Sequence, residues 1–267
     1  MGQDDNHWCG LGFAEQAVVF KGPTQNARVR TEGWVAAHLF CPGCGAEALK
    51  PLPNNAPVGD FACAACAEEF ELKAKNGRLG AKVLDGAYSA MTARLKARNN
   101  PNLLVMSYDR DAARVTDLIV VPKQFFTPSI IEPKAPTWPK GRSAPWQGCN
   151  ILIGKVPAAG KISLIREGRP VAKAAVLEQW RATLFLRDTS QTARGWLLAV
   201  MGAVEAAMDS GGRPEFTLEE VYAQEARLAA LWPGNNNVRA KIRQQLQVLR
   251  DRGWLAFGER RGTYRRT

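Results

Sequence analysis

Residues 59–73 read GDFACAACAEEFELK, and two chemical patterns overlap within this short segment. Cys63 and Cys66 form a C-x₂-C pair, and a second such pair, Cys41 and Cys44, ends 18 residues upstream. This spacing is typical of a structural zinc site, in which four thiolates surround one tetrahedral ion. Because sulfur would fill all four positions, we expect the zinc to be structural, with no open position for a substrate.

The same segment places two carboxylates and a lysine at a fixed spacing: Asp60, ten residues, Glu71, one residue and Lys73. Alternating apolar residues predict a β-hairpin here, which would bring Asp60 and Glu71 onto neighbouring strands. Glu71 and Lys73 are two positions apart, so they share one face of a strand. Two carboxylates can hold Mg²⁺ beside a phosphate, where a lysine can orient the attacking water. The pattern indicates metal-dependent phosphodiester hydrolysis, with Glu68 and Glu69 as competing acids.

Acids and lysines at this spacing also occur on ordinary solvated strands. The pattern alone therefore does not identify a nuclease, and the composition of the whole chain has to be considered with it. The 267 residues include 36 Lys and Arg against 25 Asp and Glu, a formal net charge of +11. This balance favours a nucleic acid over an acidic small molecule as the partner. No stretch approaches the roughly 20 apolar residues that span a bilayer, and the N-terminus lacks the features of a signal peptide. We therefore expect a cytoplasmic protein with no membrane partner.

The chain as far as residue 187 has the pattern of a mixed α/β domain. Predicted helices over residues 14–39 and 85–98 alternate with apolar strands, which indicates a central sheet with flanking helices. The proline-rich segment 132–145 is predicted to be a loop. We assign residues 1–187 to this domain, with the zinc finger inserted at residues 41–66.

Residues 188–267 have a different pattern, in which three predicted helices precede two short strands. This is the order of a winged helix. In the last helix, at residues 237–252, apolar residues recur at helical spacing and basic residues project elsewhere. The front of a recognition helix enters the major groove, and wing residues meet phosphates. The candidate DNA contacts are Asn236, Asn237, Arg239, Lys241, Arg243, Arg260 and Arg261. A solvated basic helix with a frayed tail is the alternative.

With these residues in hand, the chain resembles the DpnI family of methyladenine-dependent type II restriction endonucleases. The matching segments are Thr31-Glu32-x-Trp34, Cys41-Pro42-x-Cys44-Gly45, Asp60-Phe61, Glu68-Glu69-Phe70-Glu71-Leu72-Lys73, Asp85-Gly86-Ala87-Tyr88, Pro122-Lys123-Gln124-Phe125, Gly148-Cys149-Asn150, Arg194-Gly195-Trp196, Glu215-Phe216-Thr217-Leu218-Glu219 and Lys241-Ile242-Arg243-Gln244-Gln245-Leu246-Gln247. The resemblance implies a PD-(D/E)xK nuclease domain with an inserted Cys₄ zinc finger, followed by a winged helix.

The resemblance also implies an activity, which is Mg²⁺-dependent cleavage of double-stranded DNA at GATC sites that carry N6-methyladenine. The family's catalytic acids and lysine fall on Asp60, Glu71 and Lys73, and the two acids would hold Mg²⁺. Its zinc thiolates fall on Cys41, Cys44, Cys63 and Cys66. Gly59 stands where the wider nuclease group often has proline before the aspartate, which we do not expect to disturb metal binding. No obligate protein partner is implied, and we expect a monomer.

A requirement for methylation needs more energy than one methyl group supplies. Burying one methyl is worth about 0.8 kcal/mol, or roughly fourfold in affinity. Four methyl contacts, from two strands read by each of two domains, would give about 3 kcal/mol or roughly 200-fold, and steric features must add to this. In the nuclease domain we expect the reader to be the loop with Trp138, Arg142 and Trp146, since an indole offers a flat apolar face. Alternatively, both indoles pack against the sheet.

Two other functions remain open at this point. A non-cleaving regulator built from a zinc ribbon and a winged helix would bind DNA, need no Glu71-x-Lys73 pair, and show no Mg²⁺-dependent cutting. A repair nuclease that acts on DNA structure would cut methylated and unmethylated duplex equally.

Overall fold

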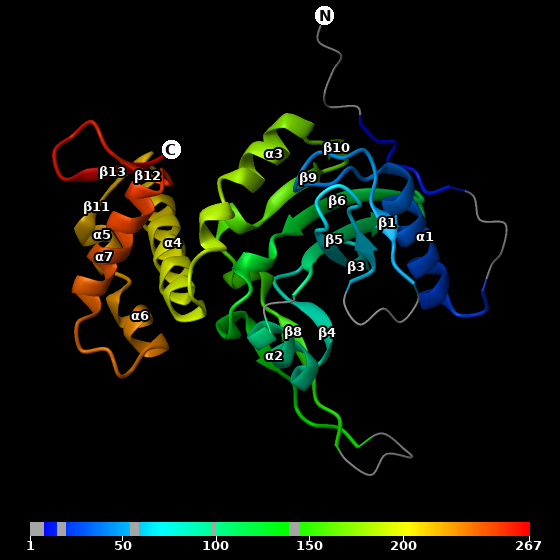
Figure 1. Cartoon of the computed structure of the whole chain (residues 1–267), viewed down its shortest axis with the longest axis horizontal. Coiled ribbons are helices and arrows are strands. Elements are labelled where there is room, and N and C mark those ends of the chain that lie inside the picture. The colour runs from blue at the N-terminus through cyan, green and yellow to red at the C-terminus, as the bar shows by residue number, and fades with distance from the viewer. Residues whose placement is uncertain (1–7, 15–19, 54–58, 98–99, 139–144) are drawn as a thin grey trace, which may run out of the picture.

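The structure is a computed structural model that describes residues 8–14, 20–53, 59–97, 100–138 and 145–267. A seven-stranded sheet with the order β1-β2-β3-β5-β6-β9-β10 forms the centre of the N-terminal part (Figure 1). Its strands are β1 (Lys50–Pro51), β2 (Phe61–Ala62), β3 (Glu69–Asn76), β5 (Asn102–Asp109), β6 (Arg114–Val121), β9 (Ile162–Arg166) and β10 (Arg169–Pro170). β3 and β5 run parallel, whereas every other neighbouring pair is antiparallel. The predicted β2–β3 hairpin and the mixed α/β class are confirmed.

Both faces of this sheet are covered, which is why β5 is apolar along almost its whole length. Leu104 and Met106 point into a core with α1 (Pro23–His38) and α3 (Lys173–Arg181). Leu103 and Val105 point to the opposite face, into a core with α2 (Tyr88–Ala97). Side chains of a strand alternate between its two faces, so the same distinction holds for β3. Glu71 pairs with Leu103 and Lys73 pairs with Val105, which places both on the α2 side of the sheet.

A smaller antiparallel sheet lies beside α2 and has the order β4-β8-β7. Its strands are β4 (Val83–Ala87), β8 (Gly148–Ile151) and β7 (Ile131–Pro133). The helix predicted from residue 85 is therefore wrong at its start, since Asp85 belongs to β4. The predicted loop is also wrong at residues 132–133, because β7 is an edge strand and an edge strand tolerates Pro133.

The first helix begins later than the sequence predicts. The side-chain amide of Asn26 accepts a hydrogen bond from the backbone N–H of Phe20 and donates one to its carbonyl, both at 2.7 Å. These bonds hold the chain before the helix in a non-helical loop. Pro23 then occupies the first turn, where the missing N–H costs nothing.

The C-terminal part begins with the long helix α4 (Gln191–Gly211), which lies on the side of this part that faces the N-terminal part in Figure 1. After α4 come β11 (Glu215–Thr217), α5 (Leu218–Tyr222), α6 (Glu225–Leu231), α7 (Val238–Asp251), β12 (Leu255–Phe257) and β13 (Thr263–Arg266). The strands form a sheet of order β11-β13-β12. Thr217 and Glu220 form a capping box at the start of α5. Helices followed by a small sheet confirm the winged-helix prediction, although β11 was not predicted.

The two parts share one apolar core, which includes Val121 and Phe125 from the first part and Trp196 and Leu197 from α4. Every helix in the described part of the chain is too short or too polar to span a lipid bilayer.

Candidate active site and metal centre

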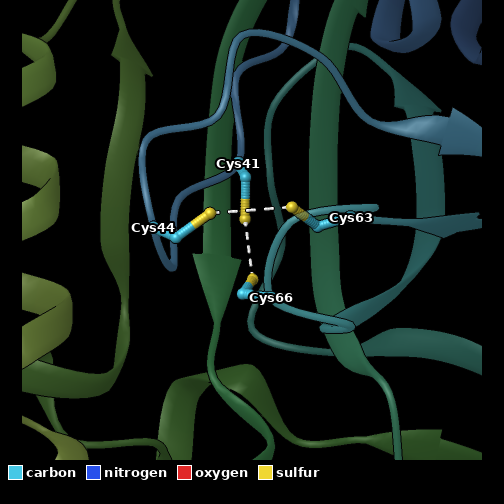
Figure 2. A group of neighbouring side chains, drawn as sticks. All are labelled: Cys41, Cys44, Cys63 and Cys66. Atoms are coloured by element: carbon cyan, nitrogen blue, oxygen red, sulfur yellow. Dashed lines mark hydrogen bonds between the residues drawn. The ribbon is translucent and has the colours of Figure 1, made fainter.

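The four cysteines predicted to bind zinc come together at one point (Figure 2). Cys41 and Cys44 follow α1, and Cys63 and Cys66 lie in the turn between β2 and β3. The Sγ atoms of Cys41 and Cys66 are 3.7 Å apart, and those of Cys44 and Cys63 are 3.6 Å apart. A tetrahedral ion with metal–sulfur bonds of about 2.3 Å requires sulfur–sulfur distances of about 3.8 Å. The cluster therefore fits a metal ion of the size of zinc.

The two thiols of the second cysteine pair differ in the direction of their pKa shifts. Burial would raise the pKa of the Cys63 thiol, but the backbone N–H groups of Cys66 and Ala65 and the neighbouring thiols outweigh burial and lower this pKa to about 7. Burial raises the pKa of Cys66 to about 11. Because thiolates rather than thiols are the metal ligands, binding of a metal ion at this cluster would be accompanied by loss of the thiol protons.

Asp60 lies directly before β2, at the open end of the hairpin and across from Glu71 of β3. Its backbone N–H donates to the carbonyl of Phe70 at 2.8 Å, and its Oδ2 accepts from the N–H of Leu72 at 2.7 Å. The backbone groups on either side of Glu71 thus hold Asp60 in place. Cys63 lies three residues further along the chain. The cysteine cluster therefore lies at the turn of the β2–β3 hairpin, and Asp60 bonds to β3 at the other end of the same hairpin.

Glu71 and Lys73 lie in a compact cluster of charged groups. Lys73 Nζ is 2.7 Å from Glu71 Oε1 and 2.8 Å from Asp85 Oδ1. Arg94, on α2, places Nη1 at 3.5 Å from Glu71 Oε2. Burial alone would lower the pKa of Lys73. The negative charges of Glu71 and Asp85 outweigh burial, so the net effect is a raised pKa. The lysine therefore remains a cation beside the acids.

Asp85 and Arg94 are members of this cluster that the sequence reasoning missed. Asp85 occurs in one of the matching segments, Asp85-Gly86-Ala87-Tyr88, which was the available signal. Its assignment to a helix hid the contact, because Asp85 reaches Lys73 only as part of β4.

Glu68, the competing acid, has partners of its own. Its carboxylate accepts from Asn102 Nδ2 at 2.8 Å and from Arg187 Nη1 at 2.8 Å, and it lies 3.2 Å from Lys123 Nζ. Burial would raise the pKa of Glu68, but Asn102, Arg187 and Lys123 lower it. Glu68 thus joins the hairpin to β5 and to the segment after α3. Glu69 pairs through its backbone with Ala62.

The predicted DNA-reading residues of the first part differ in exposure. Trp138 is 69% exposed. Trp146 is half-buried and packs over Gly148, where an added Cβ would lie 2.7 Å from the indole. Backbone hydrogen bonds of 2.7 and 2.8 Å join Trp146 to Thr137 and hold the two ends of this segment together. Arg142 lies outside the described residues.

On the winged helix, α7 buries its apolar stripe and exposes Arg239 and Arg243, whereas Lys241 and Arg250 are half-buried. Arg239 Nε binds Glu225 Oε2 at 2.7 Å, and its guanidinium lies 4.8 Å from the centre of the Tyr222 ring. Lys241 donates to Gln244 at 2.8 Å. Arg243 is exposed and makes no ion pair within the described part of the chain. The remaining candidates, Asn236, Asn237, Arg260 and Arg261, are also exposed.

Comparison with known families matches nearly the whole chain. Residues 13–189 match the family model DpnI, described as the Dam-replacing family. Residues 192–266 match the model of the corresponding C-terminal domain, described as the Dam-replacing HTH domain. The first match contains the cysteine cluster and the Glu71–Lys73 cluster, and the second contains the exposed face of α7.

Proposed function

Since this chain belongs to the DpnI, or Dam-replacing, family of restriction endonucleases, we propose that it hydrolyses double-stranded DNA at GATC sites that carry N6-methyladenine. The observation that carries the proposal is the charged cluster on β3. Glu71 and Lys73 are in direct contact there, and Asp60 is fixed across the same hairpin. A regulator that only binds DNA has no need of this arrangement. We place the nuclease domain at residues 1–187 and the winged helix at residues 188–267.

We assign Asp60, Glu71 and Lys73 the roles of the PD-(D/E)xK signature. Asp60 and Glu71 offer carboxylate oxygens, the donors that Mg²⁺ prefers, so their chemistry fits this ion. When bound, Mg²⁺ would lower the pKa of a water molecule and shield the phosphate. Lys73 would hold the attacking water by hydrogen bonding and stabilise negative charge on the phosphate. Arg94 keeps Glu71 oriented from the side of α2.

We assign zinc to the cysteine cluster, with a structural role. The cluster closes the turn that joins β2 to β3, and Asp60 and Glu71 lie on the two arms of that hairpin. Zinc would therefore fix the distance between the two acids without touching the substrate. We further propose that the protein acts as a cytoplasmic monomer.

For methyl recognition we propose Trp138 in the nuclease domain. Its indole is the largest exposed apolar side chain beside the segment that contains Arg142. An exposed indole can cover the N6-methyl group of a base presented to it, whereas Trp146 already packs on Gly148.

Digestion of one plasmid tests the proposed function directly. The plasmid is prepared with and without adenine methylation, and each form is incubated with the protein in Mg²⁺ and in EDTA. We expect discrete fragments only from methylated plasmid in Mg²⁺. Binding without cutting would favour the regulator, and equal cutting of both plasmids in Mg²⁺ would favour a repair nuclease.

A second prediction concerns the recognition helix. Arg243→Ala is expected to weaken binding of methylated GATC duplex by roughly 1–3 kcal/mol and to affect unmethylated duplex much less, as the loss of a base contact does. Arg239→Ala should have a smaller effect, because Glu225 and Tyr222 already engage that guanidinium. The measurement is a titration of the full-length protein in metal-free buffer at several salt concentrations.

Arg250→Ala is the matched control, since Arg250 lies at the far end of the same helix and pairs with Asp251. Equal weakening of both duplexes by Arg243→Ala, with a salt slope lower by about one, would identify Arg243 as a phosphate contact and contradict the prediction.

A further inference from the structure

We propose that Asp85 is a positioning residue for the nuclease reaction, which acts by holding the ammonium group of Lys73 in place beside Glu71. The inference rests on the proposed function, because it assigns Asp85 a part in the same reaction. It adds a third carboxylate to the site and gives that carboxylate a role distinct from metal binding.

The local backbone of β4 aims Asp85 at the lysine. Asp85 pairs with Cys149 of β8, and the register shifts between Asp85 and Ala87. Such an irregularity re-aims side chains relative to a regular strand. The Asp85 side chain is only 6% exposed, and its Oδ1 lies 2.8 Å from Lys73 Nζ.

Because Asp85 is buried, its carboxylate requires a partner, and Lys73 supplies one. A carboxylate removed from water is strongly destabilising unless it is paired and hydrogen-bonded. Among the described residues, Lys73 is the one cation that forms an ion pair with Asp85. Its other close neighbour is the thiol of Cys149, whose pKa burial raises to about 11, so that it remains neutral. The buried Asp85 carboxyl group is therefore directed at the lysine.

Two carboxylates from two different sheets fix the same ammonium group. Glu71 approaches Lys73 from β3 of the large sheet, and Asp85 approaches it from β4 of the small sheet. A lysine side chain has four flexible bonds, so one contact leaves its end mobile, whereas two contacts restrict it strongly. If Glu71 shares its charge with Mg²⁺, Asp85 remains as the carboxylate dedicated to Lys73.

Glu132 provides a matched control for Asp85. It belongs to the same small sheet, on β7, and its Oε2 lies 2.8 Å from Lys82 Nζ. This pair has the same chemistry and distance as the Asp85–Lys73 pair. It is solvent-exposed, with side-chain exposures of 55% for Lys82 and 36% for Glu132. Glu132→Gln therefore tests the loss of a carboxylate–lysine pair from this sheet without touching Lys73.

The experiment compares full-length Asp85→Asn, Asp85→Glu and Glu132→Gln with the unsubstituted protein. It measures the single-turnover rate on methylated duplex over a range of Mg²⁺ concentrations, and the Kd for the same duplex without metal. We expect Asp85→Asn to lower the maximal rate on the order of 10²-fold, as misplacement of a reacting group does. The half-saturating Mg²⁺ concentration and the Kd should stay within about twofold, since neither depends on the position of the ammonium group. Asp85→Glu should recover part of the rate, and Glu132→Gln should leave it unchanged.

A stability measurement supplies a readout besides activity. Asp85→Asn and Lys73→Met are each expected to lower the metal-free Tm by about 2–4 °C. The double variant should lie no lower than the less stable single variant, because both changes remove the same contact. Additive losses would mean that the two side chains do not interact, which would overturn the inference.

Other outcomes are equally decisive. A large rise in the half-saturating Mg²⁺ concentration for Asp85→Asn would make Asp85 a metal ligand and overturn the positioning role. An unchanged cleavage rate for Asp85→Asn would also overturn the positioning role. The same holds if Asp85→Asn loses cleavage and DNA binding together because the protein no longer folds. If the unsubstituted protein cuts no duplex, the proposed function fails and the inference fails with it. If the unsubstituted protein cuts and Asp85→Asn cuts equally well, the inference alone fails.

Discussion

Replacing Lys73 with alanine is expected to lower the rate of DNA cleavage by roughly 10²–10³-fold, the scale of losing one preorganised group that stabilises the transition state. Binding of methylated duplex should change little, because one ammonium held between Glu71 and Asp85 contributes little to DNA affinity. The measurement combines single-turnover cleavage in Mg²⁺ with binding in metal-free buffer. Lys75→Ala is the matched control, since Lys75 lies two positions along the same strand and is exposed.

Asp60→Ala should behave like Lys73→Ala, with cutting lost and binding retained. Asp60 would lose both a metal-binding oxygen and the hydrogen bond that its carboxylate accepts from Leu72. Substantial cutting by either variant would contradict the assignment of Asp60 and Lys73. The acid would then have to be sought at Glu69, because the carboxylate of Glu68 already binds Asn102, Arg187 and Lys123.

Replacing Cys63 with serine is expected to remove bound metal and unfold much of the nuclease domain. Cys63 is 2% exposed and belongs to the hydrophobic core as well as to the sulfur cluster. A structural zinc site contributes about 10–16 kcal/mol of apparent binding free energy, whereas a folded protein is stable by only about 5–15 kcal/mol. The free energy lost with the zinc site is therefore as large as the whole free energy of unfolding of a typical domain, and we expect the domain to unfold. Zinc content by elemental analysis and thermal unfolding measure the two effects.

Cys9→Ala is the control for this prediction, because Cys9 lies outside the metal-binding cluster. It should retain zinc at the level of the unsubstituted protein. A Cys63→Ser protein that holds no zinc yet cuts DNA at the full rate would contradict the structural role of the metal.

Much of the site follows from local spacing in the sequence. The four cysteines were predicted from two C-x₂-C pairs, and the structure brings their sulfur atoms to within 4.8 Å of one another. The shared face of Glu71 and Lys73 follows from the two-residue period of a strand, and their 2.7 Å contact agrees with it. These features depend on residues close together in the chain, so periodicity and spacing are sufficient to find them.

The features that the sequence did not predict depend on contacts between distant segments. Asp85 joins the site only because β4 pairs with β8, more than 60 residues away along the chain. The contact between Glu68, a competing acid in the sequence, and Arg187 joins residues separated by 119 positions. β11 is three residues long and forms only because it pairs with β13 near the end of the chain. Local propensity carries no information about such partners.

The most direct test of methylation-dependent cleavage is one ratio of rates, measured on two duplexes that differ only in the N6-methyl groups of a single GATC site. Each duplex is cut by the full-length protein in Mg²⁺ under single-turnover conditions at protein concentrations below saturation, where the rate includes the affinity for the duplex. The Lys73→Ala protein serves as the blank. Four methyl contacts at about 0.8 kcal/mol each predict a ratio of at least roughly 200 in favour of the methylated duplex. Equal rates on the two duplexes would contradict the account.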